Sequence, residues 1–429
     1  MSRSLDDWLA FISAQHPATI ALGLERVRDV AARMGFEGDR FHPSSSKNLS
    51  PVVVTVGGTN GKGSTCALLE RILIESGYRV GCYTSPHLLR YNERVRLHGE
   101  DAGDASLTEA FARVEAARGD TPLTYFEFGT LAALDLFARA NLEALVLEVG
   151  LGGRLDAVNI VDADCAAVVS VDLDHQSYLG DDRESIGFEK AGIYRPGRPA
   201  IFGDIDPPRR LKEHAQAIGA DLLLLGRDFR YVEHGQQWDF IGRRSTKRSL
   251  PLPALRGRWQ LKNASVALAC LDEVAERVPV SLGEVKRGLT LARLSGRLQA
   301  LPGRPAVILD VAHNPHAARA LADGLGDMGY AERTLAVFAM LGDKDIGGVV
   351  DAMRGRVDLW FVAAPAAERA ASAERVAGVL AERGLGAVTR SFATVASALE
   401  GARREVGPND RIVVFGSFYT VAEALRSAR

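Results

Sequence analysis

GGTNGKGSTC (57–66) is the stretch that decides how the rest of the chain is interpreted. It follows PVVVTV (51–56), a β-branched run typical of a buried strand, and leads into STCALLERILIESGY (64–78), whose apolar residues recur with helical spacing. A strand, a glycine-rich turn and a helix start aim backbone N–H groups at an anion. We therefore predict a phosphate-binding loop rather than a plain left-handed turn, with Lys62 reaching the outer phosphates of a nucleotide.

The loop departs from the usual P-loop in its spacing. The common form places its anchor glycines as GxxxxGK and follows the lysine with Ser or Thr, whose hydroxyl ligates Mg²⁺. Here Gly58 and Gly61 are three residues apart and Gly63 follows Lys62, so the nearest hydroxyl, on Ser64, comes one residue late. The magnesium ligands of such a site are expected elsewhere in the chain.

The length and composition of the chain indicate the broad class of protein. A chain of 429 residues is too long for one ordinary core, so we expect two domains. Hydrophobic residues make up 47% of it, charged residues 25%, and the formal net charge is −2. The chain thus lacks the charge signature of proteins that bind nucleic acid or anionic membranes, which favours small-molecule substrates.

Cysteine usage and the first residues point to the same cellular setting. The cysteines show neither a CxxC nor a Cys/His metal spacing, which is typical of buried thiols in a reducing compartment; they are Cys66, Cys82, Cys165 and Cys270. MSRSLDDWLAFISAQH (1–16) carries acids where a signal peptide needs a basic end, and no long apolar run follows. We expect a soluble, cytoplasmic protein.

The apolar runs predict an α/β fold in the first part of the chain. Short runs at 143–150, 165–172 and 198–204 alternate with helix-like stretches, as in a parallel sheet covered by helices. Residues 222–258 are turn-rich and partly alternating, which favours a small antiparallel addition.

A second domain is predicted where regular alternation of strands and helices resumes. From residue 296 the pattern is that of a doubly wound unit. We predict a P-loop ATPase-type domain at 1–295 and a Rossmann-like α/β domain at 296–429, with the hinge between them in LARLSGRLQALPGRP (291–305).

Polar residues at strand ends are the candidates for chemistry, because open α/β sheets bind ligands at the carboxyl ends of their strands. Ser85 follows a strand-like stretch, although Ser-Pro-His alone is typical of a simple turn. Glu148 is an acid within an apolar strand, where a carboxylate is costly unless it is paired or bound to a cation. An ion pair with Arg154 is the structural alternative, but we favour a ligand site.

SVDLDHQSYLG (170–180) places further candidates at another strand end, namely Asp172, Asp174 and His175. A single histidine in such a loop more often makes hydrogen bonds within the loop than binds a ligand. Interpreting His175 as part of a ligand site therefore depends on the neighbouring polar residues. Lys190 stands beside Glu189, which by itself is an ordinary helix pair.

VILDVAHNPHAARAL (307–321) contains the candidates of the second domain, which are Asp310, His313, Asn314 and His316. Asn314-Pro315 is also typical of a helix cap with proline at the first helical position. Four polar groups after one strand make a ligand site the favoured interpretation. Nearby stretches add Arg297, suited to neutralising phosphate, and Asp343, Lys344 and Asp345.

Taken together, these stretches resemble the dihydrofolate synthase/folylpolyglutamate synthase family, which is related to the Mur ligases. The resemblance runs over nearly the whole chain. It rests on TIALGLERV (19–27), GTNGKGS (58–64), TSPHL (84–88), TYFEFGTL (124–131), LEVGLGGRLDAVNIV (147–161), EKAGI (189–193), DVAHNPH (310–316) and GSFYTVAEAL (416–425).

The resemblance implies sites for ATP and metal ions. ATP is implied to contact Asn60, Gly61, Lys62, Gly63, Ser64, Asn263, Arg297 and Asp310. Ser85 and Glu148 are implied to hold one Mg²⁺ and His175 a second, and a monovalent cation such as K⁺ is a further candidate. Lys190 matches a lysine that the family carries as a carbamate, N6-carboxylysine. Catalytic roles are implied for Lys62, Lys190, His175 and Arg297.

The resemblance also implies the substrates and the reaction. The expected enzyme activates a carboxylate with ATP as an acyl phosphate, which the amine of L-glutamate attacks with release of ADP and phosphate. The implied acid substrates are 7,8-dihydropteroate and reduced folates, and the implied oligomeric state is a monomer. The matching substrate residues are Thr19, Ile20, Ala21, Leu22, Thr124, Tyr125, Phe126, Glu127, Leu155, Asp156 and Ala157. A glutamate or phosphate group is the candidate ligand of His313, Asn314 and His316.

Some positions depart from the family pattern. His175-Gln176-Ser177-Tyr178 stands where His-Thr-Asp-Trp is usual, Phe188 where an arginine is common, and Tyr419 where a histidine is common. None removes an implied metal ligand, but they bear on the surroundings of the site and on glutamate recognition.

Three alternatives are weighed against the bifunctional ligase. One is an enzyme with only the folylpolyglutamate synthase activity. A muropeptide synthetase needs a UDP-binding domain, for which about 50 residues before the loop are too few. A P-loop switch or kinase has no need of the second α/β domain with DVAHNPH (310–316).

Overall fold

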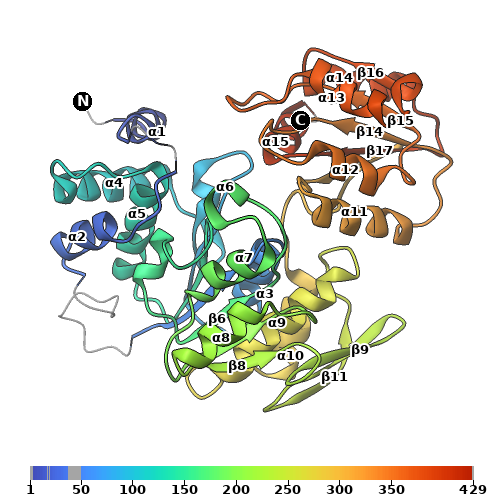
Figure 1. The fold of residues 1–429 in the computed structure, drawn as a ribbon. Coiled ribbons are helices and arrows are strands. Elements are labelled where there is room, and N and C mark those ends of the chain that lie inside the picture. Colours follow the sequence, from blue (N-terminus) through green and yellow to red (C-terminus); the bar gives the residue numbers. More distant parts are fainter. Residues whose placement is uncertain (1–2, 17, 19, 37–49, 428–429) are drawn as a thin grey trace. The chain divides into compact units, whose positions relative to one another are not determined.

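The computed structural model describes residues 3–16, 18, 20–36 and 50–427. The chain divides into two compact units, one made of Met1–Ala254 with Leu261–Ala292 and one made of Leu255–Gln260 with Arg293–Arg429 (Figure 1). Both units are α/β, which confirms the predicted fold class. The domain boundary at 295/296 stays a prediction.

An eight-stranded, mostly parallel sheet organises the first unit. In spatial order its strands are β4 (Glu100–Asp101), β3 (Val95–Leu97), β2 (Val80–Tyr83), β5 (Ala144–Glu148), β1 (Val52–Gly57), β6 (Cys165–Val168), β7 (Pro199–Phe202) and β8 (Asp221–Leu224). β1 lies between β5 and β6 and is buried along its whole length, as its run of valines predicts. The sheet therefore places the phosphate-binding stretch directly after an inner strand.

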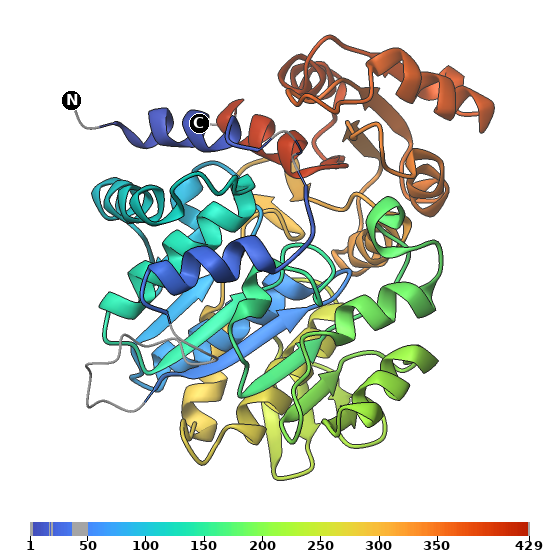
Figure 2. The same cartoon turned by 60° about the vertical axis from the view of Figure 1, so that its left-hand side comes forward.

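The helices of this unit pack on the sheet and on one another. α3 (Lys62–Glu75) contacts β1, β2, β5 and α10 (Leu282–Leu291), while α4 (Asp104–Arg118) lies beside α5 (Tyr125–Arg139) and α2 (Glu25–Arg33) (Figure 1, Figure 2). The other helices are α1 (Leu5–Ser13), α6 (Gln176–Leu179), α7 (Arg183–Ala191), α8 (Arg209–Ala217), most of α9 (Trp259–Glu273), η1 (Tyr91–Arg94) and η2 (Ala157–Ile160). Val53, Leu145 and Leu147 from the inner strands belong to the buried core.

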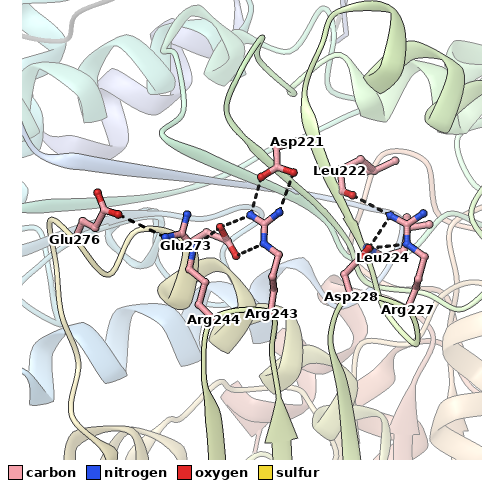
Figure 3. A network of polar contacts seen from close by, with 9 residues as sticks. All are labelled: Asp221, Leu222, Leu224, Arg227, Asp228, Arg243, Arg244, Glu273 and Glu276. Carbon is pink, nitrogen blue, oxygen red and sulfur yellow. Dashed lines mark hydrogen bonds and ion pairs between the residues drawn. The ribbon is translucent and has the colours of Figure 1, made fainter.

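The predicted antiparallel addition is a three-stranded sheet of β9 (Arg230–His234), β10 (Gln237–Ile241) and β11 (Thr246–Pro251). Figure 3 shows how its β10–β11 turn is held: Arg243 Nη2 lies 2.6 Å from an Asp221 carboxylate oxygen and 2.7 Å from a Glu273 carboxylate oxygen. The prediction was wrong about residues 222–224, which pair in parallel with β7 as part of β8 because this apolar run extends the main sheet.

The second unit is built on a six-stranded sheet. In spatial order its strands are β12 (Gln299–Leu301), β13 (Ala306–Asp310), β17 (Arg411–Phe415), β14 (Thr334–Phe338), β15 (Leu359–Val362) and β16 (Thr389–Ser391). Its other elements are α11 (Pro315–Asp327), α12 (Ile346–Met353), α13 (Ala373–Glu382), η3 (Gly386–Val388), α14 (Val395–Glu405) and α15 (Phe418–Ser427). The prediction of a hinge at 291–305 was too long, because β12 pairs antiparallel with β13 at the edge of this sheet.

The structure also describes the cysteines and the lengths of the helices. The four cysteines are buried free thiols, as expected. Among the described residues, no helix combines the length and the apolar character that crossing a bilayer requires.

Candidate active site

The inner strands of the first sheet bring several predicted residues to one edge. β1 pairs in parallel with β5 and β6, and β5 pairs in parallel with β2, so their carboxyl ends lie together. Val56 is opposite Glu148 and Gly57 is opposite Val168. The loop after β1, Glu148, the Ser85 loop after β2 and the segment leading to His175 after β6 therefore meet at this edge.

The loop after β1 is shaped by glycine. Gly61 is the N-cap of α3 in a left-handed conformation, with φ of 88°, and as a glycine it has no side chain to cap the helix start. A Cβ on Gly61 would lie 2.5 Å from Asn263 Oδ1, and a Cβ on Gly58 would lie 3.1 Å from the amide nitrogen of Ser170. Only glycine suits these two positions, and Asn263, an implied ATP contact, borders the loop.

Hydrogen bonds hold the rest of the loop to the segment after β6. The Thr59 and Asn60 amides donate to the Ser170 carbonyl at 2.8 Å and to Ser170 Oγ at 3.1 Å. Lys62 Nζ donates to the Gly58 carbonyl at 3.0 Å, which places its charge over the loop. The open helix start and the lysine together form a cradle suited to phosphate.

Ser85 and Glu148 are neighbours at this edge. The Ser85 amide donates to Glu148 Oε2 at 3.1 Å, and the Glu148 side chain is buried. Arg154, the alternative partner considered for Glu148, forms an ion pair with Glu189 at 2.9 Å. A serine hydroxyl and a carboxylate on two such neighbouring residues are oxygen donors of the kind that Mg²⁺ prefers.

The protein supplies few donors for a metal ion at this edge. Within the part of the chain that the structure describes, no group of three or more His, Cys, Asp and Glu side chains could hold a metal ion by itself. Mg²⁺ commonly keeps waters and takes substrate phosphate oxygens beside one or two carboxylates. The residues present fit that mode of binding.

Two residues that the sequence did not single out position the Ser85 loop. The Glu93 carboxylate accepts hydrogen bonds from the Leu88, Leu89 and Arg90 amides at 2.7 to 2.8 Å. Arg96 donates to Thr84 Oγ1 at 3.1 Å and pairs with Glu70 at 2.7 Å. The only signal for them in the sequence is the charged run after TSPHL, which is typical of any exposed turn.

His175 follows β6 and opens α6 in a left-handed conformation, with φ of 52°. Its amide donates to Asp174 Oδ1 at 2.8 Å, and its Nε2 lies 3.9 Å from that oxygen. Asp172 is bonded through its amide to Thr59 Oγ1 at 3.0 Å, which links this segment to the phosphate loop. His175 follows this link by three residues along the chain, and its role as a metal ligand stays a prediction.

Lys190 is buried near charged groups of the same region. Burial, reinforced by the positive charge of Lys62, lowers its pKa to about 7, and Asp174 and Asp156 act in the opposite direction. A lysine with this pKa is partly neutral at pH 7, so its amine can act as a nucleophile. This is the condition for the predicted carbamate.

The three implied folate stretches are connected. Arg26 donates to the Ala21 carbonyl at 2.9 Å and forms an ion pair with Glu127 at 2.8 Å. The Gly23 amide donates to the Leu155 carbonyl at 3.4 Å. Ile20 and Leu22 are half-buried beside these contacts, and Thr19 lies outside the described residues.

Aromatic rings and one buried acid complete this group. Tyr125 and Phe126 are half-buried, and Phe126 packs against Gly150, where a Cβ would lie 2.6 Å from its ring. Asp156 accepts from the Leu151 and Val158 amides, and burial raises its pKa to about 6. Thr124 and Glu127 form the capping box that starts α5, while Ala157 begins η2.

In the second unit, the predicted residues gather at the end of β13. Asp310 is buried and accepts from the Leu298 and Ala312 amides, both at 2.8 Å, and burial raises its pKa. The Arg297 guanidinium lies 5.2 Å from the centre of the Phe418 ring, and His313 lies 6.3 Å from it.

Several residues of this group have structural roles. Asn314 caps α11, and Pro315 occupies the first turn, as the cap interpretation predicted. Asp345 caps α12, and Asp343 pairs with Arg369 at 2.9 Å. His316 and Lys344 are half-buried in the first turn of α11 and the segment before α12, and Tyr419 is exposed in α15.

Phe188, where the family commonly has an arginine, is itself contacted by arginines. Arg210 lies 4.8 Å and Arg154 5.9 Å from the centre of its ring. Positive charge is therefore retained around this position, although it comes from other residues.

Comparisons with known proteins identify relatives of the chain. Residues 296–418 match the family model described as Mur ligase, glutamate ligase domain. The chain is 46% identical to a dihydrofolate synthase/folylpolyglutamate synthase of Escherichia coli K12, over 98% of this chain and 94% of that one. It is similar to the solved E. coli FolC in complex with DHPP and ADP, with 44% identity, a TM-score of 0.92 and coverage of 100% and 98%. It is also similar to a solved bifunctional folylpolyglutamate synthase/dihydrofolate synthase with Mn, AMPPNP and L-glutamate bound. This match has 42% identity, a TM-score of 0.90 and coverage of 100% of this chain and 98% of that one.

Proposed function

The chain belongs to the dihydrofolate synthase/folylpolyglutamate synthase family, and we propose that it adds L-glutamate to 7,8-dihydropteroate and to reduced folates through an acyl phosphate. It is an ATP-dependent ligase of the Mur ligase type. The observation that carries the proposal is 46% identity to such an enzyme over 98% of the chain.

The residues of the first unit support the activation step. A carboxylate is a poor acyl donor, so transfer of the ATP γ-phosphoryl group to it, with release of ADP, creates a better leaving group. The open start of α3 and Lys62 would offset charge on the transferring group. The glutamate amine then attacks the acyl carbon, and phosphate leaves.

We assign the nucleotide and metal contacts on the same grounds. Ser85 and Glu148 would hold a divalent metal ion, which supplies positive charge to the phosphates when it is bound. A second ion at His175, the identity of the ions as Mg²⁺, and a K⁺ site are part of the proposal. ATP would contact the residues of the loop and the other positions expected from the resemblance, namely Asn60, Gly61, Lys62, Gly63, Ser64, Asn263, Arg297 and Asp310.

Lys190 is proposed to be carbamylated. Its burial and its pKa of about 7 support reaction of the neutral amine with CO₂, in which a C–N bond would form, one proton would be released to solvent, and the side chain would become an anionic carbamate. An anion at this position, near Lys62, would suit a site that holds metal cations.

The folate is proposed to bind where the stretches around Ala21, Tyr125 and Leu155 are connected. Arg26 and the Gly23 amide join them, and the half-buried rings of Tyr125 and Phe126 offer stacking surfaces for a pteridine. His313, Asn314 and His316 remain candidates for glutamate or phosphate binding in the second unit.

One assay tests the proposed function. The purified protein is incubated with ATP, Mg²⁺, L-glutamate and either dihydropteroate or tetrahydrofolate, and ADP release is followed together with the mass of the folate product. We expect ADP and a product one glutamyl residue heavier with each acid. No ADP release with dihydropteroate would leave only a folylpolyglutamate synthase, and full ATP turnover without glutamate would support a non-ligase NTPase.

The state and location of the enzyme are also proposals. We infer a monomer acting on small molecules in the cytoplasm. Light scattering of the purified protein tests the first point: a mass near 46.1 kDa is expected, and twice that mass would contradict it.

A further inference from the structure

Arg94, at the end of η1, is held in place by three neighbouring side chains. Its guanidinium carbon lies 5.4 Å from the ring centres of both Tyr91 and Tyr125. Its Nε donates to His87 Nδ1 at 2.8 Å. Because arginine can only donate, the His87 ring accepts at Nδ1 and carries its proton on Nε2. Stacking and this bond orient the arginine while leaving its two terminal nitrogens available.

The arginines on either side along the chain are committed to acidic partners. Arg90 pairs with Asp104 at 2.9 Å, and Arg96 pairs with Glu70 at 2.7 Å. Arg94 forms no ion pair within the described residues, and its Nη1 and Nη2 donate to no acceptor among them. The Arg94 guanidinium is oriented, half-buried and not paired with a carboxylate of the described residues. Its two terminal nitrogens can therefore bind a carboxylate of a ligand.

The position of Arg94 indicates which part of a ligand it would meet. Tyr125 belongs to a stretch proposed to bind the pteridine, whereas His87 is two residues from Ser85, at the end where the acyl phosphate forms. Arg94 thus lies between the two ends of the folate. This reasoning rests on the proposed function.

We propose that Arg94 binds the α-carboxylate of the terminal glutamate of reduced folate substrates. This group is absent from dihydropteroate, whose single carboxylate is the one that reacts. The reacting carboxylate is the nucleophile that attacks the ATP γ-phosphoryl group, and an arginine bound to it would weaken that nucleophile by drawing charge from it. An arginine on the α-carboxylate would instead hold the glutamyl group of the folate without touching the reacting atoms. Arg94 is therefore a specificity residue for the second of the two activities.

The test compares substrates that differ in the α-carboxylate. KM is measured for tetrahydrofolate and for tetrahydropteroyl-4-aminobutyrate, which keeps the reacting carboxyl and lacks the α-carboxylate, with dihydropteroate as a third acid. The variants are Arg94→Gln and Arg94→Lys. Arg90→Gln is the matched control, because Arg90 is exposed on the same turn and pairs with Asp104. Thermal melting and ADP binding check that each variant is folded.

The expected result is a change in discrimination between substrates. The wild type should have a KM for the aminobutyrate analogue about 10- to 100-fold above that for tetrahydrofolate, the effect of a charge-assisted pair. Arg94→Gln should bring this ratio near one. Its loss of kcat/KM with tetrahydrofolate should be at least about tenfold larger than its loss of kcat/KM with dihydropteroate. Arg94→Lys should keep part of the ratio, and Arg90→Gln all of it.

Several outcomes would overturn the inference. They are a wild-type ratio near one, an unchanged ratio in Arg94→Gln, and equal losses on dihydropteroate and tetrahydrofolate. A wild-type enzyme that ligates glutamate to dihydropteroate alone would also overturn it while leaving that activity in place. The wild-type rates separate this outcome from failure of the proposed function. If the proposed function is wrong, the wild-type enzyme ligates glutamate to none of the three acids.

Discussion

α3 in the first unit and α11 in the second both follow inner strands, and they start differently. α11 follows β13 and is capped by Asn314, whose side chain accepts from the Ala317 amide at 2.9 Å. α3 follows β1 and begins at Gly61 with no side-chain cap. Both starts carry the partial positive charge of a helix N-terminus. The order of strand and helix places a helix start at the edge of the sheet in both units. The N-cap residue determines whether the N–H groups of that helix start are available to a ligand.

The same contrast extends to other helices. α5, α7, α10 and α12 each begin after a residue whose side chain accepts a bond from the first turn; these are Thr124, Asp182, Ser281 and Asp345. Capping stabilises a helix by about 1 kcal/mol, so leaving α3 uncapped has a cost that ligand binding can offset. The following predictions test this comparison, from the largest effect to the smallest.

Closing the open start should abolish nucleotide binding. Gly61→Ala introduces a Cβ 2.5 Å from Asn263 Oδ1 at a φ of 88°, so the loop must shift. We expect kcat/KM to fall by about 10³-fold, because aligned backbone donors to the phosphates are lost. Calorimetry with ADP measures the loss of affinity directly.

A glycine of the same conformation is the control for this variant. Gly35 has a φ of 85°, and a Cβ added to it would meet no atom within 4 Å. Gly35→Ala should lower stability by about 1 kcal/mol through backbone strain and leave ADP affinity unchanged. Equal ADP affinities for Gly61→Ala and wild type would break the proposed link between the open start and phosphate.

Removing the buried lysine should be the next largest effect. Lys190→Ala is expected to lower kcat by about 10²- to 10³-fold, and short carboxylates or added bicarbonate should probe the carbamate role. Lys212→Ala, at an exposed position of α8, is the control. Wild-type activity in Lys190→Ala would contradict the proposed role.

The pKa of Lys190 adds a pH dependence with a definite sign. Its folded-state value of about 7 lies below the ordinary 10.5, so between these values the folded protein binds fewer protons than the unfolded chain. Stability against unfolding should therefore rise with pH over this window, and the penalty of charging the buried amine is fully present below pH 7. Denaturant titrations of CO₂-depleted wild type, in which Lys190 is a free amine, and of Lys190→Met measure the difference, and parallel curves would contradict it.

Weakening the proposed metal contact should change metal dependence more than nucleotide binding. Glu148→Gln is expected to raise the half-saturating Mg²⁺ concentration by about 10- to 100-fold, since the carboxylate charge is lost. Glu143→Gln is the control, because Glu143 lies at the other end of the same strand and pairs with the exposed Arg79. An unchanged magnesium titration in Glu148→Gln would remove it from the metal site.

The smallest effect is expected at the capped start. Asn314→Ala should lower the stability of the second unit by about 1 kcal/mol, and Asn314→Asp should restore it, because aspartate also caps. Denaturation monitored by Trp360 fluorescence, from the core of this unit, measures both. Loss of catalysis in Asn314→Asp with normal stability would instead support a glutamate or phosphate site at Asn314.

Much of the site could be predicted because its signals are local or follow the sheet. The loop after β1 was recognisable from adjacent residues, and Ser85 and Glu148 are strand-end residues that parallel pairing brings to one edge. Arg26 was missed because its contact with Glu127 spans 101 positions, so no local pattern around Arg26 indicates it. The strand β12 was missed for a similar reason: three residues in a Gly- and Pro-rich stretch become a strand only when β13 offers an edge.

The sequence by itself determined the order of most strands and helices and the glycine positions of the phosphate loop, since these depend on neighbouring residues and on periodicity. Its motifs also indicated the family, through their resemblance to known sequences. Tertiary structure alone decided the pKa of Lys190 and the contrast between Arg94 and Arg96. Burial of Lys190 in the fold lowers its pKa, and the charges of Lys62, Asp174 and Asp156 act on it because folding brings these residues near. The two arginines are alike in sequence, and only folding gives Arg96 its carboxylate and leaves Arg94 oriented by rings. Electrostatic environment is a property of what surrounds a side chain, and distant segments supply those surroundings.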